Sequence, residues 1–226
     1  AGKILSINLT DRTIGFIGTE QYAERFLGGR GIATALYYDM VHPDAGAFDE
    51  RNCLIMAVGP LAGMPGGLRG SRWGVYCKSP LPRMSHRGKD LFCYGNLGGT
   101  FGSELRFAGY DAIVVTGRSE RPVYIEIADD SIRFRPADHI WGETTHAAME
   151  VLAGEVPERS RSMVIGPAGE NMVPLASILA TGDSSCSGGT GSVMGSKNLK
   201  AITVRGTHRN IVVENRDRLK EIENCI

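Results

Sequence analysis

Apolar and polar residues alternate in two stretches near the N-terminus, and this period of two is typical of β-strands with one buried face. The stretches are KILSINL (3–9) and TIGFIG (13–18), with a polar turn over 10–12 between them. Together they predict a β-hairpin. The apolar spacing then changes to that of an amphipathic helix over 21–27.

The same succession returns in the second half of the chain. PVYIEIA (122–128) and IRFRP (132–136) are separated by the polar residues 129–131 and predict a second hairpin. Helical spacing follows over 144–152. We interpret the recurrence as an internal duplication.

The matched segments continue beyond the helices. An apolar strand ends in Gly-Pro in both CLIMAVGPLAG (53–63) and SMVIGPAGE (162–170), and each strand then enters a loop of small residues. A further strand follows each loop, GVYCK (74–78) in one half and AITVRG (201–206) in the other, and we match these two strands to each other.

These halves predict the fold class and the domain organisation. Strands and helices do not alternate regularly enough for a doubly wound parallel sheet, so the sequence favours an α+β fold of two similar, intertwined halves with mixed or antiparallel sheets. We expect one domain over 1–210, made of repeats over about 1–115 and 116–210, and the start of a linker or helix over 211–226.

Charge and hydropathy exclude several partners. Basic and acidic side chains number 25 each, so no net field attracts nucleic acid or anionic lipid. The longest apolar runs fall far below the roughly 20 residues of a membrane helix, and residues 1–20 carry no signal-peptide pattern. We expect a cytoplasmic protein that binds neither nucleic acid nor a membrane.

The five cysteines include no C-x-x-C pair, which argues against a disulfide framework and against a self-contained zinc or iron–sulfur site. Cys53 and Cys77 lie in apolar runs and are expected to be buried thiols. Cys186 lies between serines in a glycine-rich segment, and we expect it to be exposed.

Four segments are richer in glycine than turns alone usually require: GGRG (28–31), GMPGGLRGSR (63–72), GNLGGTFG (95–102) and GDSSCSGGTGSVMGSK (182–197). Basic residues accompany three of them, namely Arg30, Arg69, Arg72 and Lys197. Backbone N–H groups without neighbouring side chains and the planar guanidinium of arginine both bind phosphate well. The pattern therefore predicts a large or internally symmetric anionic ligand shared by the two halves. The alternative is that the loops only turn corners of a duplicated scaffold.

The common nucleotide fingerprints do not match these loops. Residues 189–195 read G-x-G-x-x-x-G, one residue too long for the dinucleotide pattern, and 195–197 reverse the order of a P-loop. Glu104 and Arg106 are expected to be solvated helix charges, and His139 and His146 have no evident metal spacing or carboxylate partner. The sequence contains no recognisable nucleophile–base pair.

Six blocks in the same order resemble the N-terminal domain of the aldehyde ferredoxin oxidoreductase family: GPLAG (59–63), SRWGVYCKSPL (71–81), GNLGGTFGSELRFAGYDAIVVTGR (95–118), HIWG (139–142), IGPAGEN (165–171) and VMGSKNLKAI (193–202). Enzymes of this family hold tungsten, or sometimes molybdenum, between two pterins beside a [4Fe-4S] cluster. They typically oxidise aldehydes to acids and reduce ferredoxin. The resemblance implies that this domain is the base on which the paired pterins lie.

The resemblance also implies roles for particular residues. Arg72 matches an arginine that bridges a pterin phosphate and the cluster. Asn96, and a residue near Ser184 in the other half, match positions whose backbone carbonyls bind a magnesium ion between the pterin phosphates. The glycines that would let the backbone approach the cofactor are Gly95, Gly98, Gly99, Gly188 and Gly189.

Three departures from the family's pattern lead to two hypotheses. Asp183 and Ser187 stand where some members carry arginine, the segment 82–90 is longer and more basic, and the C-x-x-C-x-x-x-C cluster ligands are not in this chain. The first hypothesis is a cofactor-binding domain that works with C-terminal domains or a separate subunit, with ferredoxin and with a second copy of itself as further candidate partners, and that is inactive alone. The second is a non-catalytic pterin carrier or assembly module.

Overall fold

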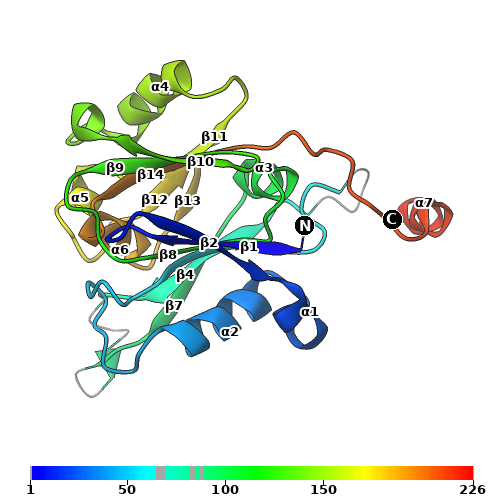
Figure 1. Ribbon diagram of the computed structural model, residues 1–226, viewed down its shortest axis with the longest axis horizontal. Helices are drawn as coiled ribbons and strands as arrows, with labels where there is room; N and C mark the ends of the chain where they lie inside the picture. The colour runs from blue at the N-terminus through cyan, green and yellow to red at the C-terminus, as the bar shows by residue number, and fades with distance from the viewer. Residues whose placement is uncertain (1, 65–69, 82–84, 87–88, 226) are drawn as a thin grey trace.

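The computed structural model describes residues 2–64, 70–81, 85–86 and 89–225. Two six-stranded mixed sheets lie one above the other in Figure 1, with helices between them and on both outer faces. Among the described residues, no helix is long and apolar enough to cross a membrane.

The two sheets have the same strand order, which confirms the predicted α+β fold of two similar halves. In order across the sheet, the first contains β2 (Thr13–Gly18), β1 (Lys3–Asn8), β8 (Ala112–Thr116), β3 (Leu54–Val58), β4 (Trp73–Lys78) and β7 (Phe92–Leu97). The second contains β10 (Ser131–Pro136), β9 (Val123–Ala128), β14 (Leu199–Arg205), β11 (Arg161–Val164), β12 (Ile178–Ala180) and β13 (Ser184–Cys186). A separate two-stranded hairpin joins β5 (Ser85–His86) and β6 (Lys89–Asp90).

The strand order corrects one pairing of the repeat. By position in the sheets, β4 corresponds to β12 and β8 corresponds to β14. The expected match of 74–78 with 201–206 was therefore wrong. The sequence concealed the true counterpart because β12 is only three residues long and lies within a segment of small residues.

The helices make the halves interdependent. They are α1 (Glu20–Phe26), α2 (Arg30–Met40), α3 (Phe101–Phe107), α4 (Thr145–Glu155), α5 (Pro167–Glu170), α6 (Thr190–Ser196) and α7 (Arg216–Glu223), with a 3-10 turn η3 (Asp138–Ile140). Helix α3 of the first half contacts β11 and β14 of the second, and α6 of the second half contacts β3 and β4 of the first. Both helices thus lie between the sheets, as Figure 1 shows.

Side-chain alternation along the strands supplies a separate core for each face of the first sheet. Leu5, Met56 and Ile113 point into the layer between the sheets, whereas Ile4 and Ile55 point towards α2. All five are fully buried. Each contributes about 1.5–3 kcal/mol by leaving water, so register in these strands is strongly determined.

Candidate functional site

A cleft of about 270 Å³ opens where the N-terminus of α2 lies over the ends of β3, β4 and β7. It is lined by Gly28, Gly29, Arg30, Ala57, Gly59, Arg72, Trp73, Gly74, Tyr76 and Asn96. Three of the four glycine-rich segments therefore reach this cleft, together with Arg72 and Asn96, the two residues on which the family resemblance places most weight.

Its described lining residues include two arginines and no carboxylate. Arg30 and Arg72 are both exposed, and neither forms an ion pair with a carboxylate of the described chain. The Arg30 guanidinium lies 3.9 Å from the centre of the Tyr94 ring. Burial raises the pKa of Tyr76, and the nearby Arg30 opposes that rise. The cleft is therefore a positively charged concave surface that suits an anion.

Several residues that line this cleft are glycines, and their lack of side chains shapes its base. A Cβ atom on Gly59 would meet nothing within 4 Å, so the missing side chain leaves open space there. A Cβ atom on Gly74 would instead collide with the Tyr76 hydroxyl. Gly29 has φ +50°, which disfavours any other residue at the start of α2.

The glycine-rich segments 95–102 of the first half and 182–197 of the second, called the two corners below, meet beside this cleft. The Gly98 N–H donates to Ser184 Oγ at 2.6 Å, and Trp73 Nε1–H donates to the Gly98 carbonyl at 2.9 Å. Gly99 has φ +71°, and a Cβ atom there would lie 2.8 Å from the Thr181 carbonyl oxygen. The corners therefore lie on the same side of the molecule and in direct contact with each other.

At some of these glycines, the space that a side chain would need is filled by other parts of the protein. A Cβ atom on Gly95 would collide with the Cys186 sulfur, and one on Gly189 would lie 2.8 Å from Pro80 Cδ in the first half. The Gly188 carbonyl accepts a hydrogen bond from Ser79 Oγ at 2.8 Å. Gly95 and Gly189 thus let the two halves approach each other closely, and Gly188 contributes a backbone bond between them, in contrast to Gly59, which opens onto free space.

Lys197 does not reach the cleft, although the sequence grouped it with the phosphate-binding cations. It is 1% exposed and donates to the carbonyl of Glu50 (3.3 Å) in the first half and to that of Gly117 (3.1 Å) at the junction of the halves. Burial lowers its pKa to about 8. Arg69 falls outside the described residues, as does most of the basic segment 82–90.

Glu104 and Arg106 were expected to be solvated, and this expectation was wrong. Glu104 is 4% exposed and accepts hydrogen bonds from Arg209 (2.7 Å) and from the Gly206 N–H (3.0 Å). Arg106 forms an ion pair with Asp111. Glu104 meets residues more than 100 positions away, and Arg106 meets an aspartate just beyond the end of its own helix, so helical periodicity alone could not show either contact.

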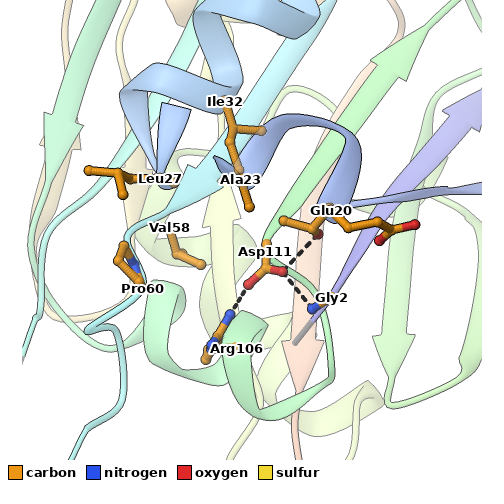
Figure 2. Close-up of a pocket in the computed structure, with 11 residues that line it drawn as sticks. Gly2, Glu20, Ala23, Leu27, Ile32, Val58, Pro60, Arg106 and Asp111 are labelled. Atoms are coloured by element: carbon orange, nitrogen blue, oxygen red, sulfur yellow. Dashed lines mark hydrogen bonds and ion pairs between the residues drawn. The ribbon is translucent and has the colours of Figure 1, made fainter. Parts of the chain in front are cut away.

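A second pocket, of about 290 Å³, lies near the Arg106–Asp111 pair (Figure 2). The Asp111 carboxylate also accepts hydrogen bonds from the Gly2 N–H at 2.7 Å and from Thr19 Oγ1 at 2.8 Å. Its charge is therefore compensated inside the fold, and this pair acts as a structural support beneath α1.

Two further expectations were wrong. Cys186 is fully buried, and burial raises the pKa of its thiol to about 12. His139 has a carboxylate partner after all, because its Nε2 lies 2.9 Å from Glu155 Oε1 in α4. Among the described residues, no group of three or more His, Cys, Asp or Glu side chains could hold a metal ion.

Comparison with known proteins identifies the family. A family model for the aldehyde ferredoxin oxidoreductase N-terminal domain matches residues 4–206. The chain belongs to this family. The tungsten-containing aldehyde ferredoxin oxidoreductase of Pyrococcus furiosus is 42% identical over 212 residues, which are 91% of this chain and 33% of that protein. An aliphatic sulfonate oxidoreductase, WOR-like subunit, of the same organism is 32% identical over 225 residues, covering 91% of this chain and 34% of that protein.

A solved structure agrees with the family assignment. The active-site complex BamBC of benzoyl coenzyme A reductase, in complex with 1,5-dienoyl-CoA, is similar with a TM-score of 0.90 and 36% identity. The match covers 99% of this chain and 33% of the other. This aldehyde ferredoxin oxidoreductase N-terminal domain thus spans about a third of the length of the relatives it matches.

Sequence reasoning missed the contribution of α2 to the cleft. The segment 28–31 was interpreted as a glycine loop, but Arg30 begins an 11-residue helix. The apolar spacing of Ile32, Ala33 and Leu36, all buried, was the signal that could have shown it.

Proposed function

We propose that this chain is the cofactor-holding domain of a tungsten- or molybdenum-pterin oxidoreductase that oxidises aldehydes to carboxylic acids with ferredoxin as the electron acceptor. The observation that carries the proposal is one cleft in which Arg72, Asn96 and the glycine-rich start of α2 come together beside the joined corners of the two halves. Membership of a family whose relatives are named for tungsten supports the choice of cofactor.

The residues present fit a phosphate-bearing pterin. The cleft offers two guanidinium groups without an acidic neighbour among its described lining, and Gly59 leaves space for a ligand to approach the backbone. Arginine can grip phosphate at two points, which fixes orientation as well as affinity. In this proposal Arg72 binds a pterin phosphate from the β4 side of the cleft.

In this proposal the two corners also bind a magnesium ion. Gly98, Gly99 and Ser184 lie at the contact between the halves, and the backbone carbonyls of Asn96 and Ser184 are the proposed ligands of a magnesium ion between the phosphates. Gly95 and Gly189 act indirectly, because their lack of side chains lets the two halves meet, and Gly188 does so through a backbone conformation with φ +90°. The metal and its pterins supply the redox chemistry, and the protein supplies position and electrostatics.

The choice of substrate is proposed to lie outside this domain. Relatives with this domain are named for an aldehyde, for an aliphatic sulfonate and for benzoyl coenzyme A. A shared domain that serves different substrates is best explained as a holder of the common cofactor. The iron–sulfur cluster and the remaining active-site groups are proposed to come from C-terminal domains or a separate subunit in the cytoplasm.

The proposal is tested by metal analysis of the full-length gene product. Arg72→Ala should lower the tungsten or molybdenum content per protein at least several-fold, because one phosphate contact is lost. Arg118→Ala, at an exposed arginine outside the cleft, is the control. Metal content that is unchanged in Arg72→Ala would contradict the role given to the cleft.

A specific observation favours a second candidate, a non-catalytic pterin carrier of the same fold. Asp183 is exposed at the corner of the second half, with φ +55°, and places negative charge where some family members carry arginine. Sequencing the gene beyond codon 226 separates the two, because a downstream C-x-x-C-x-x-x-C block in the same or an adjacent frame supports the enzyme. The 226-residue chain alone is expected to be colourless and to show no aldehyde-dependent viologen reduction.

A further inference from the structure

We propose that Arg30 is a second phosphate-binding residue of the cleft, held in place by the ring of Tyr94. This inference rests on the proposed function and deepens it, because it assigns the ligand at least two negative charges. Arg30 comes from α2, whereas Arg72 comes from the entrance to β4, so the two guanidinium groups approach one cleft from different elements.

Other arginines around this face have partners inside the protein. Arg106 is paired with Asp111, and Arg25 lies over the Phe26 ring at 5.2 Å without lining the cleft. Arg30 and Arg72 have no carboxylate partner among the described residues. Two positive charges in one cleft repel each other, and a bound dianionic phosphate group would compensate both of them.

The position of Arg30 is fixed by its surroundings. Gly29 precedes it in a backbone conformation with φ +50°, and the Gly29 N–H donates to the Val58 carbonyl at 3.0 Å. This bond ties the start of α2 to the end of β3. The guanidinium then rests on Tyr94 at 3.9 Å from the ring centre, a cation–π contact that limits its rotation.

The N-terminus of α2 adds to the same field. Its first residue is Arg30, so the positive end of the helix dipole and the guanidinium charge both lie at the cleft. A phosphomonoester or pyrophosphate group is the chemistry that this arrangement recognises. It can come from the pterin cofactor or from a free phosphate compound, and the experiment separates these sources.

The first measurement is pyrophosphate binding to the 226-residue chain by calorimetry. Arg30→Ala should weaken binding about tenfold or more, as should Arg72→Ala, because each loses a charge-assisted contact. Arg25→Ala is the matched control, since it too is an arginine stacked on an aromatic ring, and it should bind like the wild type. Tyr94→Phe should keep the affinity and Tyr94→Leu should lower it, because the ring face makes the contact with Arg30.

The second measurement is the pterin and metal content of the full-length gene product. A loss in Arg30→Ala identifies the cofactor as the source of the phosphate. Full content in Arg30→Ala, together with a loss in Arg72→Ala, overturns the inference and leaves the proposed function standing. Wild-type affinity for pyrophosphate in Arg30→Ala, or no pyrophosphate binding by the wild type, also overturns the inference, whereas the proposed function is judged separately by the metal content of Arg72→Ala.

Discussion

At the scale of single residues, this domain contains buried polar groups whose partners come from distant parts of the chain. Lys78 donates to three carbonyls, and Lys200 is fully buried against Glu170. Lys197 is the most informative of them, because its ammonium group from the second half binds a carbonyl of the first half and one at the junction of the halves. Such a charge is stable in the interior only while its partners stay in place.

The pH dependence of stability should show the buried state of Lys197. Its pKa falls from 10.5 to about 8 on folding, because burial disfavours the charged form. Between these values the unfolded chain binds more protons than the folded one. The contribution of Lys197 to the free energy of unfolding should therefore rise, by roughly 3 kcal/mol, as the pH increases from 8 to 10.5.

Urea denaturation of the wild type and Lys197→Met at several pH values measures this effect. Other groups titrate in both proteins, so the difference between the two isolates the lysine. The difference should move in favour of the wild type as the pH rises through this range. A difference that does not depend on pH would contradict the assignment.

Thiol reactivity gives a second test at this scale. Cys53, Cys77, Cys93 and Cys186 are buried, and burial raises the pKa of Cys53 to about 11 and that of Cys186 to about 12, whereas Cys225, just beyond α7, is exposed. The native protein should therefore react with one equivalent of a thiol reagent quickly and with further equivalents only after denaturation. Fast modification of Cys186, located by mass spectrometry, would show that the corner of the second half opens.

At the scale of elements, helix α6 is enclosed by the protein along its whole length. All seven of its residues are buried, and it packs against α5 within its own half. A Cβ atom on Gly195 would collide with the Gly169 carbonyl. The glycines of this segment thus serve close helix packing as well as the turn that precedes α6.

The packing of α6 predicts opposite effects of the same substitution in two helices. Gly195→Ala should lower the free energy of unfolding by at least about 2 kcal/mol, because α5 must move. Gly154→Ala, at an exposed position of α4 with nothing within 4 Å of the new Cβ atom, should raise it by roughly 0.5–1 kcal/mol through helix propensity. Chemical denaturation of both variants measures the contrast, and equal effects would contradict the packing described for α6.

At the scale of the whole molecule, the exchange of α3 and α6 between the sheets joins the halves into one cooperative unit. The largest cluster of buried apolar residues contains members from both sheets, including Leu5, Trp73, Ile125 and Val204. Either half alone would expose the apolar side chains of this layer to water. The halves should consequently unfold together.

The two tryptophans report on this cooperativity, because Trp73 lies in the first half and Trp141 in the second. In Trp141→Phe and Trp73→Phe, each with one remaining reporter, the fluorescence midpoint should coincide with the far-ultraviolet dichroism midpoint of the same variant. Separate midpoints within one variant would show that the halves unfold independently.

The sequence by itself determined the fold class, the two hairpins and the duplication. These follow from local periodicity, since strand alternation in 3–9 and 122–128 is a property of neighbouring residues. It also singled out Arg72 as an arginine beside a glycine-rich segment, and the family resemblance added Asn96; both line the cleft. The family comparison confirmed the resemblance drawn from these motifs.

Only the tertiary structure decided which cations face the cleft and which are buried. Lys197 and Arg72 both accompany glycine-rich segments, yet Lys197 is buried against a carbonyl of the other half and Arg72 lies open. The burial of Glu104 and Cys186 likewise depends on residues of the opposite half, more than 80 positions away. Periodicity in sequence describes the faces of one element, whereas the packing of helices exchanged between two sheets fixes what each face meets.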